Sequence, residues 1–385
     1  MSETLNMMSV SVETFIRFIK EQIEDEDLSP VIGIGKSGVG KTESIYELTQ
    51  EMGIGFCELR LVTMTETDLL GIPYQTEDNT TNWSSNNLLP IASRDGEKGI
   101  LVLDEITSCS STIRAAAYQL LDSKRALGNY KLPPGWKVVA LGNGPDDGGV
   151  FSGMESAFLS RGRCLRIEPD LAAWKKWAIG KSVNPSVIAF LSFMPEYLHD
   201  FDPNEIASVF PCPRSWVSLS KMLNNRERRN GGKPLDPMSI DIYAASCVGS
   251  KVAPKFGAFY SYNKSVIDTE DIMAGKAPTD VSSFTSEVMY IVVQNLIKEV
   301  STTLANGYSG QGQFKPDTVK RVANACNWLI GVGNKSSLDF AIMAMQDLAN
   351  NVPKFRELVL SDDNFDDECP DFMGFAENNA VIFGK

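Results

Sequence analysis

The sequence has little of several features that define common classes of protein. Histidine occurs once, at His199, so a serine or cysteine triad that needs histidine has a single candidate base. No apolar run approaches the roughly 20 residues that a membrane-spanning helix needs, so we expect no membrane span. Residues 1–28 lack the basic and apolar segments of a secretory or mitochondrial signal, which favours a cytoplasmic location.

Positive charge and paired cysteines are also scarce. The 36 Lys and Arg residues face 49 Asp and Glu residues, and the net charge of −13 argues against a general nucleic-acid binder, although a local basic strip stays open. The seven cysteines are scattered and never form a Cys-x-x-Cys motif, which indicates reduced, mostly buried thiols. A hydrophobic content of 43% over 385 residues is enough for two or three compact units.

Apolar patterning divides the chain. Residues 10–23 are spaced as one face of a helix, and an acidic run follows. Between residues 30 and 169, short apolar runs alternate with helical stretches, which predicts a parallel sheet with crossover helices. The predicted strands are Val31–Ile34, Cys57–Val62, Ile100–Leu103 and Val138–Leu141.

Helical patterns dominate after residue 169. The acidic segment 361–371 has few apolar residues, so we expect it to be solvated. The predicted organisation is an N-terminal helix and linker at 1–28, an α/β core at 29–170, an all-helical domain at 171–275 and a helical C-terminal extension with an acidic tail at 276–385.

A glycine-rich loop with a phosphate-binding pattern lies between the first predicted strand and a predicted helix. Its glycines allow backbone N–H groups to converge on phosphate oxygens, next to the positive end of the helix. Lys41 is suited to neutralise the β and γ phosphates of ATP, and the Thr42 hydroxyl to bind Mg²⁺. The pattern Gly-x-x-x-x-Gly-Lys-Thr comprises Gly35, Lys36, Ser37, Gly38, Val39, Gly40, Lys41 and Thr42.

A dinucleotide site is the rival interpretation of this loop. Residues 33–38 also fit Gly-x-Gly-x-x-Gly, and Glu58 follows at about the expected distance of ~20 residues. Such a site has no use for the Lys41-Thr42 pair, and Gly33 falls inside the predicted strand rather than at its end. The phosphate loop of an ATPase is therefore favoured.

Polar residues follow two further predicted strands. Asp104 and Glu105 end the strand that begins near Gly99, as in a Walker B motif. Asp104 would hold Mg²⁺, and Glu105 would orient the water that attacks the γ phosphate. Asn143 follows the strand at 138–141 and could position the same water, although an asparagine there is also a common turn former.

Together these motifs resemble the AAA+ ATPases, specifically the MoxR branch. The resemblance covers residues 30–225, and residues 67–73 give its closest local match. It implies an AAA+ core with a helical lid, and a chaperone-like homo-oligomer, usually a hexameric ring, with ATP at each subunit boundary. Such proteins often act on a partner that contains a von Willebrand factor A domain.

The resemblance also implies roles for three arginines. Arg161, within residues 160–163, is similar to the finger that a neighbouring subunit inserts, and Arg163 is its competitor. Arg214 is similar to the sensor 2 arginine of the lid, and Pro213 before it suits a helix start. Lys36 departs from the small residue or proline that is common in the family's loop.

Three functions remain to be weighed. The first is an ATPase whose hydrolysis remodels or activates a partner protein. The second is a nucleic-acid motor subunit, which the overall acidity disfavours but does not exclude. The third is a nucleotide-dependent scaffold with little turnover, and the intact Lys41, Asp104 and Glu105 count against it.

Overall fold

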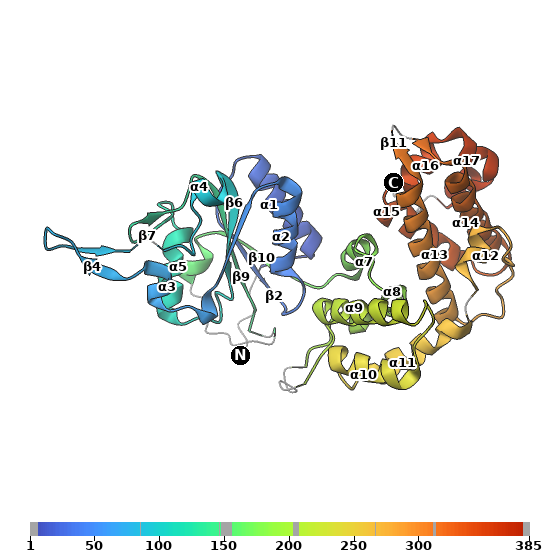
Figure 1. The fold of residues 1–385 in the computed structure, drawn as a ribbon, viewed down its shortest axis with the longest axis horizontal. Helices are drawn as coiled ribbons and strands as arrows, with labels where there is room; N and C mark the ends of the chain where they lie inside the picture. Colours follow the sequence, from blue (N-terminus) through green and yellow to red (C-terminus); the bar gives the residue numbers. More distant parts are fainter. Residues whose placement is uncertain are drawn as a thin grey trace. The chain divides into compact units, whose positions relative to one another are not determined.

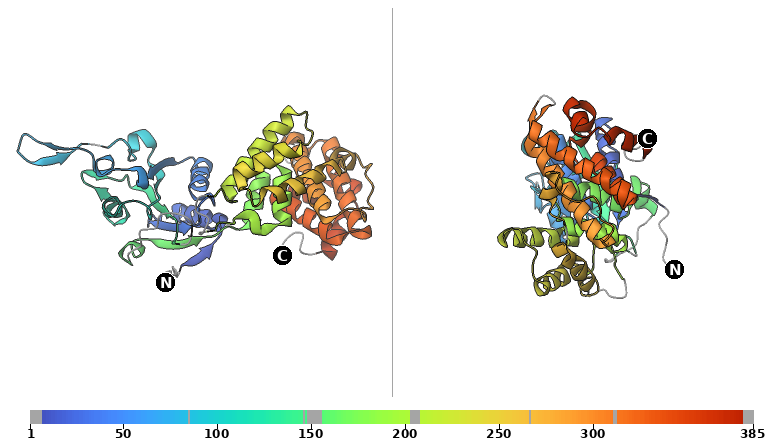
Figure 2. Two further views of the ribbon diagram at one scale, coloured as in Figure 1. Left: turned by 90° about the horizontal axis from the view of Figure 1, so that it is seen from below. Right: turned by 90° about the vertical axis from the view of Figure 1, so that its right-hand side faces the viewer.

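The computed structural model describes residues 7–84, 86–145, 147, 156–202, 208–265, 267–310 and 313–379. The chain forms two compact units (Figures 1 and 2). Unit 1 comprises residues 1–170 with 201–208 and 212–214, and unit 2 comprises residues 171–200, 209–211 and 215–385.

Unit 1 is built on a parallel sheet, as the sequence predicts, and this sheet has six strands, of which β1 and β10 were not among the predicted ones. The strand order is β1-β10-β2-β9-β6-β3. The P-loop strand β2 therefore neighbours β9 and β10, and β9 separates β2 from β6. The strands are β1 (Met8–Val10), β2 (Val31–Gly35), β3 (Gly55–Arg60), β6 (Lys98–Asp104), β9 (Gly135–Gly142) and β10 (Arg163–Ile167).

Both faces of this sheet are covered, which explains why its central strands are continuously apolar rather than alternating. Successive side chains of β6 enter different clusters: Ile100 packs with helices α1 (Val12–Glu24) and α2 (Lys41–Met52), whereas Leu101 packs with α5 (Ser111–Leu121). Two helical layers thus enclose the sheet and leave its strand ends available for polar residues.

The structure corrects two details of the predicted elements. Val10 ends strand β1, which pairs with β10, and helix α1 begins only at Val12 because Ser11 caps it. The strand predicted to continue to Val62 ends at Arg60 and is followed by a 3-10 turn.

Smaller elements surround the sheet of unit 1. A hairpin of β4 and β5 extends away from it (Figure 1). The small elements are the turn η1 (Leu61–Thr63), helices α3 (Glu66–Leu70), α4 (Ala92–Asp95) and α6 (Ser156–Leu159), and strands β4 (Pro73–Gln75), β5 (Thr81–Trp83), β7 (Ala126–Leu127) and β8 (Tyr130–Lys131).

Unit 2 is helical apart from a short hairpin, in agreement with the predicted loss of strand patterns after residue 169. No helix in the described part of the chain is long and apolar enough to cross a membrane.

The elements of unit 2 are α7 (Leu171–Gly180), α8 (Pro185–Phe193), η2 (Pro195–Leu198), α9 (Pro213–Arg229, which begins in unit 1), α10 (Pro237–Val248), α11 (Ala253–Ser261), η3 (Tyr262–Ser265), α12 (Thr269–Met273), α13 (Ser286–Gly307), β11 (Tyr308–Gly310), β12 (Gln313–Phe314), α14 (Pro316–Lys335), α15 (Leu338–Asn351), α16 (Phe355–Ser361), α17 (Asp363–Glu368) and α18 (Phe372–Asn378).

The acidic segment 361–371 is more ordered than its composition suggests. It forms helix α17, and Phe365 and Cys369 are buried in the core of unit 2. Its neighbours Asp366 and Asp367 remain exposed. The expectation of a wholly solvated segment is wrong because a few well-placed apolar groups anchor the turn while the carboxylates stay in water.

Candidate active site

Lys41 occupies the centre of the phosphate loop. Strand β2 ends at Gly35, α2 begins at Lys41, and Gly40 caps the helix in the left-handed region with φ of +98°. The Lys41 Nζ donates to the backbone oxygens of Gly35 at 2.6 Å and Lys36 at 2.9 Å, and to Asn143 Oδ1 at 3.1 Å. The ammonium group is thus held by three oxygen acceptors at the carboxyl ends of β2 and β9.

Burial destabilises the charged form of the Lys41 side chain. Desolvation lowers the pKa of Lys41 to about 8, although the carboxylates of Asp104, Asp147 and Glu105 act in the opposite direction. The Arg214 guanidinium lowers it further. A phosphate group would stabilise the charged form, so anion binding and protonation of this lysine are coupled.

The Walker B residues face the start of α2. Asp104 Oδ2 accepts a hydrogen bond from Thr42 Oγ1 at 2.9 Å, and Asp104 Oδ1 accepts one from the Glu105 backbone N–H at 2.9 Å. Glu105 has a φ of +58°, which is uncommon for a residue with a side chain and re-aims the chain directly after β6.

The donor set fits a magnesium ion that is shared with a nucleotide. Among the described residues, no group of three or more acidic, cysteine or histidine side chains could hold a metal on its own. Mg²⁺ usually takes one or two protein oxygens and completes its shell with phosphates and waters. Thr42 and Asp104 supply two such oxygens beside the loop.

Strand order explains how Asn143 reaches the site. Because β9 lies between β2 and β6, its carboxyl end lies between the P-loop and Asp104. The Asn143 backbone N–H donates to Thr107 Oγ1 at 3.0 Å, while its side chain binds Lys41. The asparagine therefore has a contact that a simple turn former would not need.

Several residues near the loop were missed by sequence reasoning. Asp147, whose side chain is fully buried, accepts from Gly144 N–H at 2.7 Å and pairs with Arg166 at 2.9 Å. Arg166 also binds Glu168, which lies 3.6 Å from Lys36 Nζ. The unusual charge of Lys36 is thus balanced by an acid. These partners come from distant segments and form no motif that a sequence could reveal.

The segment that contains Arg214 contacts the loop through its backbone. The Arg214 N–H donates to the Gly38 carbonyl at 3.0 Å, and the buried Cys212 side chain lies directly against Gly38. Gly38 has a φ of +77°. The segment 212–214 accordingly belongs to unit 1, although the rest of α9 belongs to unit 2.

Arg161 and Arg163 do not join this site. Arg163 begins strand β10, opposite Val31 at the amino end of β2, whereas the P-loop follows the carboxyl end of β2. Arg161 Nε donates to Asp122 Oδ1 at 2.9 Å and its guanidinium lies 5.3 Å from the centre of the Tyr118 ring. The structure therefore brings together Lys41, Thr42, Asp104, Glu105, Asn143 and Arg214, and leaves both candidate finger arginines at the other edge of the sheet.

Arg163 and Lys137 instead anchor the linker before β2. Arg163 pairs with Asp27, and hydrogen bonds from Ser29, together with this guanidinium, hold the pKa of Asp27 well below its usual range. The fully buried Lys137 Nζ donates to Gln22 Oε1 at 2.6 Å and to the carbonyls of Asp27 and Ser29 at 3.0 and 2.8 Å. At this edge of the sheet, Arg163 and Lys137 therefore hold the linker before β2 in place.

Three solved structures that match the chain share little sequence with it. The closed state of Hsp104 with ATPγS and casein is 17% identical, over 49% of this chain and 37% of that one, with a TM-score of 0.34. A protein of Cytophaga hutchinsonii described as a candidate ATPase is 12% identical over 90% and 82%, with a TM-score of 0.31. A mutant form of RuvB from Thermotoga maritima is 10% identical over 90% and 86%, with a TM-score of 0.32.

A family model gives a firmer comparison. No curated protein matches the chain. Residues 30–161 match the family described as AAA domain (dynein-related subfamily), and this range contains β2 with the P-loop, the Walker B strand β6 and Asn143. The parallel sheet, the P-loop before α2 and the adjacent acidic pair accord with that match. Residues 30–161 are therefore an AAA domain, and the protein is a P-loop ATP hydrolase.

Proposed function

We propose that the cluster around Lys41 hydrolyses Mg-ATP, with each residue in a distinct role. The observation that carries this proposal is the convergence of three strand ends, where Lys41 binds Asn143 and Thr42 binds Asp104. Lys41 stabilises charge on the β and γ phosphates, and Thr42 and Asp104 hold Mg²⁺. The metal ion would neutralise the charge that develops on the phosphate oxygens.

Two side chains are proposed to position the water molecule that attacks the γ phosphate. Glu105 follows Asp104 at the end of β6 and orients and polarises the water. Asn143 supplies a side-chain amide that exchanges its contact with Lys41 for contact with the substrate or the water. Arg214 lies close enough to act on the charge of Lys41, and it is proposed to sense the nucleotide.

The test is steady-state ATP hydrolysis by Glu105→Gln beside a matched control. This variant should bind ATP but lose about 100-fold or more in turnover, the scale of a general base. Glu58→Gln, on the neighbouring strand and paired with Arg60, should leave turnover unchanged. Unchanged turnover in Glu105→Gln would remove this residue from the catalytic role.

We further propose that copies of the chain form a ring, with six subunits as the expected number, and share each ATP site. Arg161 remains the first candidate for the finger and Arg163 the second. Their place at the amino edge of the sheet supports supply to a neighbour, because neither reaches the P-loop of its own chain. An inserted arginine offsets charge on the transferring phosphoryl, with effects on the order of 10³ to 10⁵ in rate elsewhere.

Subunit mixing tests this sharing. Lys41→Ala subunits and Arg161→Ala subunits should each be inactive, and a mixture should regain activity because some interfaces then combine an intact P-loop with an intact arginine. The same mixture with Arg163→Ala distinguishes the two candidates. Rings that form without any recovery would contradict a shared site.

The work of the ATPase is proposed to be the remodelling or activation of a partner protein, as in the MoxR branch. The bond from Arg214 N–H to the Gly38 carbonyl supports this, because it ties helix α9 to the loop that would hold the phosphates. A partner with a von Willebrand factor A domain is the first candidate. Pull-down with Glu105→Gln in ATP should retain the partner, and Lys41→Ala should release it.

A cytoplasmic location is part of this proposal. All seven cysteines are free thiols, and four of them are buried. Free thiols are the usual state in reducing compartments. Fractionation of cells that express the native chain provides the test, and recovery outside the cytoplasm would contradict it.

A further inference from the structure

A basic surface lies on unit 2, in contrast to the net charge of the chain as a whole. Residues 221–233, at the end of α9 and in the loop after it, contain five basic residues and one acidic residue, while the chain carries −13. The acidic residue, Glu227, is turned inward, where it accepts hydrogen bonds from Tyr260 and Asn184. The exposed basic residues are Lys221, Arg226, Arg228, Arg229 and Lys233.

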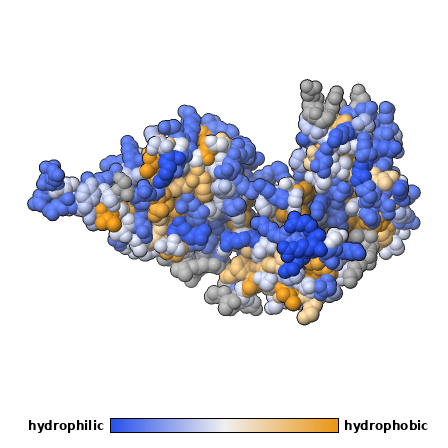
Figure 3. Space-filling model, in the orientation of Figure 1, coloured by the Kyte–Doolittle hydropathy of each residue, from blue (hydrophilic) through white to orange (hydrophobic). Residues whose placement is uncertain are grey.

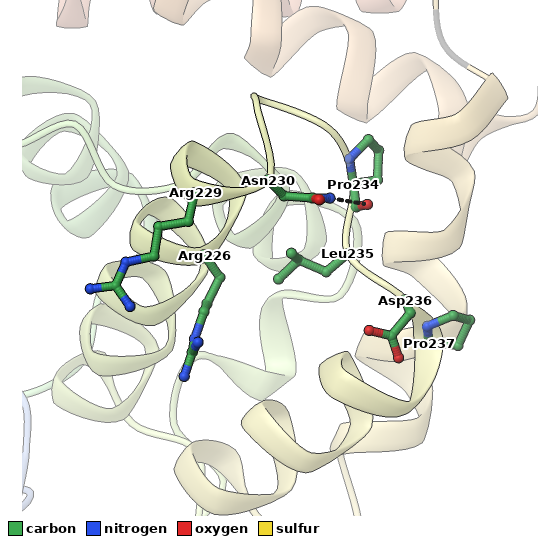
Figure 4. A pocket seen from close by; sticks show the side chains of 7 residues that line it. All are labelled: Arg226, Arg229, Asn230, Pro234, Leu235, Asp236 and Pro237. Carbon is green, nitrogen blue, oxygen red and sulfur yellow. Dashed lines mark hydrogen bonds between the residues drawn. The ribbon is translucent and has the colours of Figure 1, made fainter.

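A cavity of about 560 Å³ opens beside these arginines. It is lined by Arg226, Arg229 and Asn230 from α9 and by the segment 234–237 that leads into α10. Figure 4 shows both arginine side chains on α9, with Arg229 pointing away from the segment 234–237. Asn230 closes the turn through hydrogen bonds to the carbonyls of Lys233 and Pro234. The groove is therefore built from a helix end and a braced loop.

Two exposed apolar side chains lie on α10, the helix that follows the lining segment 234–237. Met238 and Ile242, one turn apart on α10, are 73% and 55% exposed. Arg226 lies against the same helix, with its guanidinium 5.6 Å from the centre of the Tyr243 ring. Figure 3 shows hydrophobic and strongly hydrophilic residues next to one another on the face that carries α9 and α10. Exposed apolar groups beside arginines are typical of protein interfaces.

A polyanion such as nucleic acid suits this groove less well than a protein. Asp236 lies in its lining, and hydrogen bonds from the Ser239 hydroxyl and, to a lesser extent, the Ser239 backbone N–H hold the pKa of this carboxyl below its usual value. The Asp236 carboxylate repels phosphates and carboxylates alike and so does not distinguish them, whereas Met238 and Ile242 offer nothing to a phosphate backbone. The occupant should carry both carboxylates and apolar side chains.

The chain itself has a surface of this kind on α16–α18. Asp366, Asp367 and Glu368 are consecutive exposed acids, and within the described residues no ion pair engages them. Leu360 on α16 and Met373 on α18 are 60% and 40% exposed. This acidic surface, defined as Leu360, Asp366, Asp367, Glu368 and Met373, has negative charge and exposed apolar side chains that complement the basic groove.

We propose that the basic groove of α9–α10 on one copy docks the acidic surface of a second copy. Within unit 2, α10 and α17 lie at opposite ends in Figure 1, so one chain cannot satisfy both surfaces by itself. A contact between two different surfaces is heterologous and repeats from copy to copy, closing into a ring when the rotation permits. This contact is separate from the nucleotide site and from Arg161.

Charge reversal provides the test, by sedimentation velocity over a range of protein concentrations with and without ATP. R226E/R229E and D366K/D367K should each weaken self-association by at least roughly tenfold, since each replaces attraction by repulsion across the contact. A chain that carries both pairs of changes should associate as the native chain does. The control K276E/K320E makes the same charge change as R226E/R229E at exposed lysines elsewhere on unit 2 and should have no effect.

Each contrary outcome overturns the proposal. These outcomes are a native chain that stays monomeric at every concentration, an R226E/R229E variant that associates normally, or a combined variant that fails to recover. Circular dichroism and thermal unfolding check that the variants are folded. If the native chain binds labelled oligo(dT) and R226E/R229E does not, the groove is a nucleic-acid surface and the proposal is overturned.

Discussion

Gly38 provides the sharpest test of the loop geometry. Its φ of +77° lies in the left-handed region, and a Cβ atom at this position would lie 2.5 Å from Cys212 Sγ and 3.1 Å from Cys212 Cβ. Gly38→Ala therefore meets two costs, one from backbone conformation and one from overlap with the segment before Arg214. Both would move the loop away from the conformation that holds Lys41.

A substitution at Gly40 measures backbone strain without steric overlap. Gly40 also has a positive φ, of +98°, but the nearest atom to a Cβ at this position would be Ser44 Oγ at 3.8 Å, an ordinary contact. Gly40→Ala should thus cost only backbone strain, about 1–2 kcal/mol, or roughly tenfold in ATP affinity. Gly38→Ala adds overlap, typically about 1–3 kcal/mol, and should weaken binding by a further factor of roughly ten or more.

Cys212→Ala distinguishes overlap from strain. In the double variant Gly38→Ala/Cys212→Ala the sulfur atom is absent, and only the 3.1 Å contact to the Cβ atom of residue 212 remains. The double variant should therefore recover part of the ATP affinity that Gly38→Ala loses and approach the affinity of Gly40→Ala. The assay is titration with a fluorescent ATP analogue, with thermal unfolding as a check on folding. Strictly additive effects, or a Gly38→Ala variant that binds better than Gly40→Ala, would refute the packing of residues 212–214 on the loop.

Three further predictions follow from buried or paired groups. Because burial lowers the Lys41 pKa to about 8, this lysine is charged below that pH, so ATP affinity should fall as the pH rises through 8; Lys41→Arg should show no such dependence. Asp104→Asn should raise the Mg²⁺ concentration needed for half-maximal hydrolysis by about tenfold or more, and an unchanged requirement would exclude it as a ligand. Lys137→Met should lower the free energy of unfolding in urea by about 1–3 kcal/mol, since three acceptors lose their donor. Lys131→Met, at an exposed position, should be nearly neutral.

Much of the fold could be predicted because its signals are local. The central strands β2, β6 and β9 are buried on both faces, so each appears in the sequence as a continuous apolar run. The P-loop is equally local, since its glycines, Lys41 and Thr42 must be adjacent to form one turn before α2. Interruptions such as the strand end at Arg60 were missed, because tertiary packing decides where a strand stops.

The sequence by itself therefore determined the phosphate loop, the acidic pair after β6 and the succession of a sheet domain by helices. Only the tertiary structure decided which strand lies between the P-loop and Asp104, and hence that Asn143 contacts Lys41. It also decided that Arg166 and Asp147 pair beside the loop and that Cys212 packs on Gly38. Such contacts join residues that are far apart in the chain, so they depend on strand order and register rather than on any neighbouring residue.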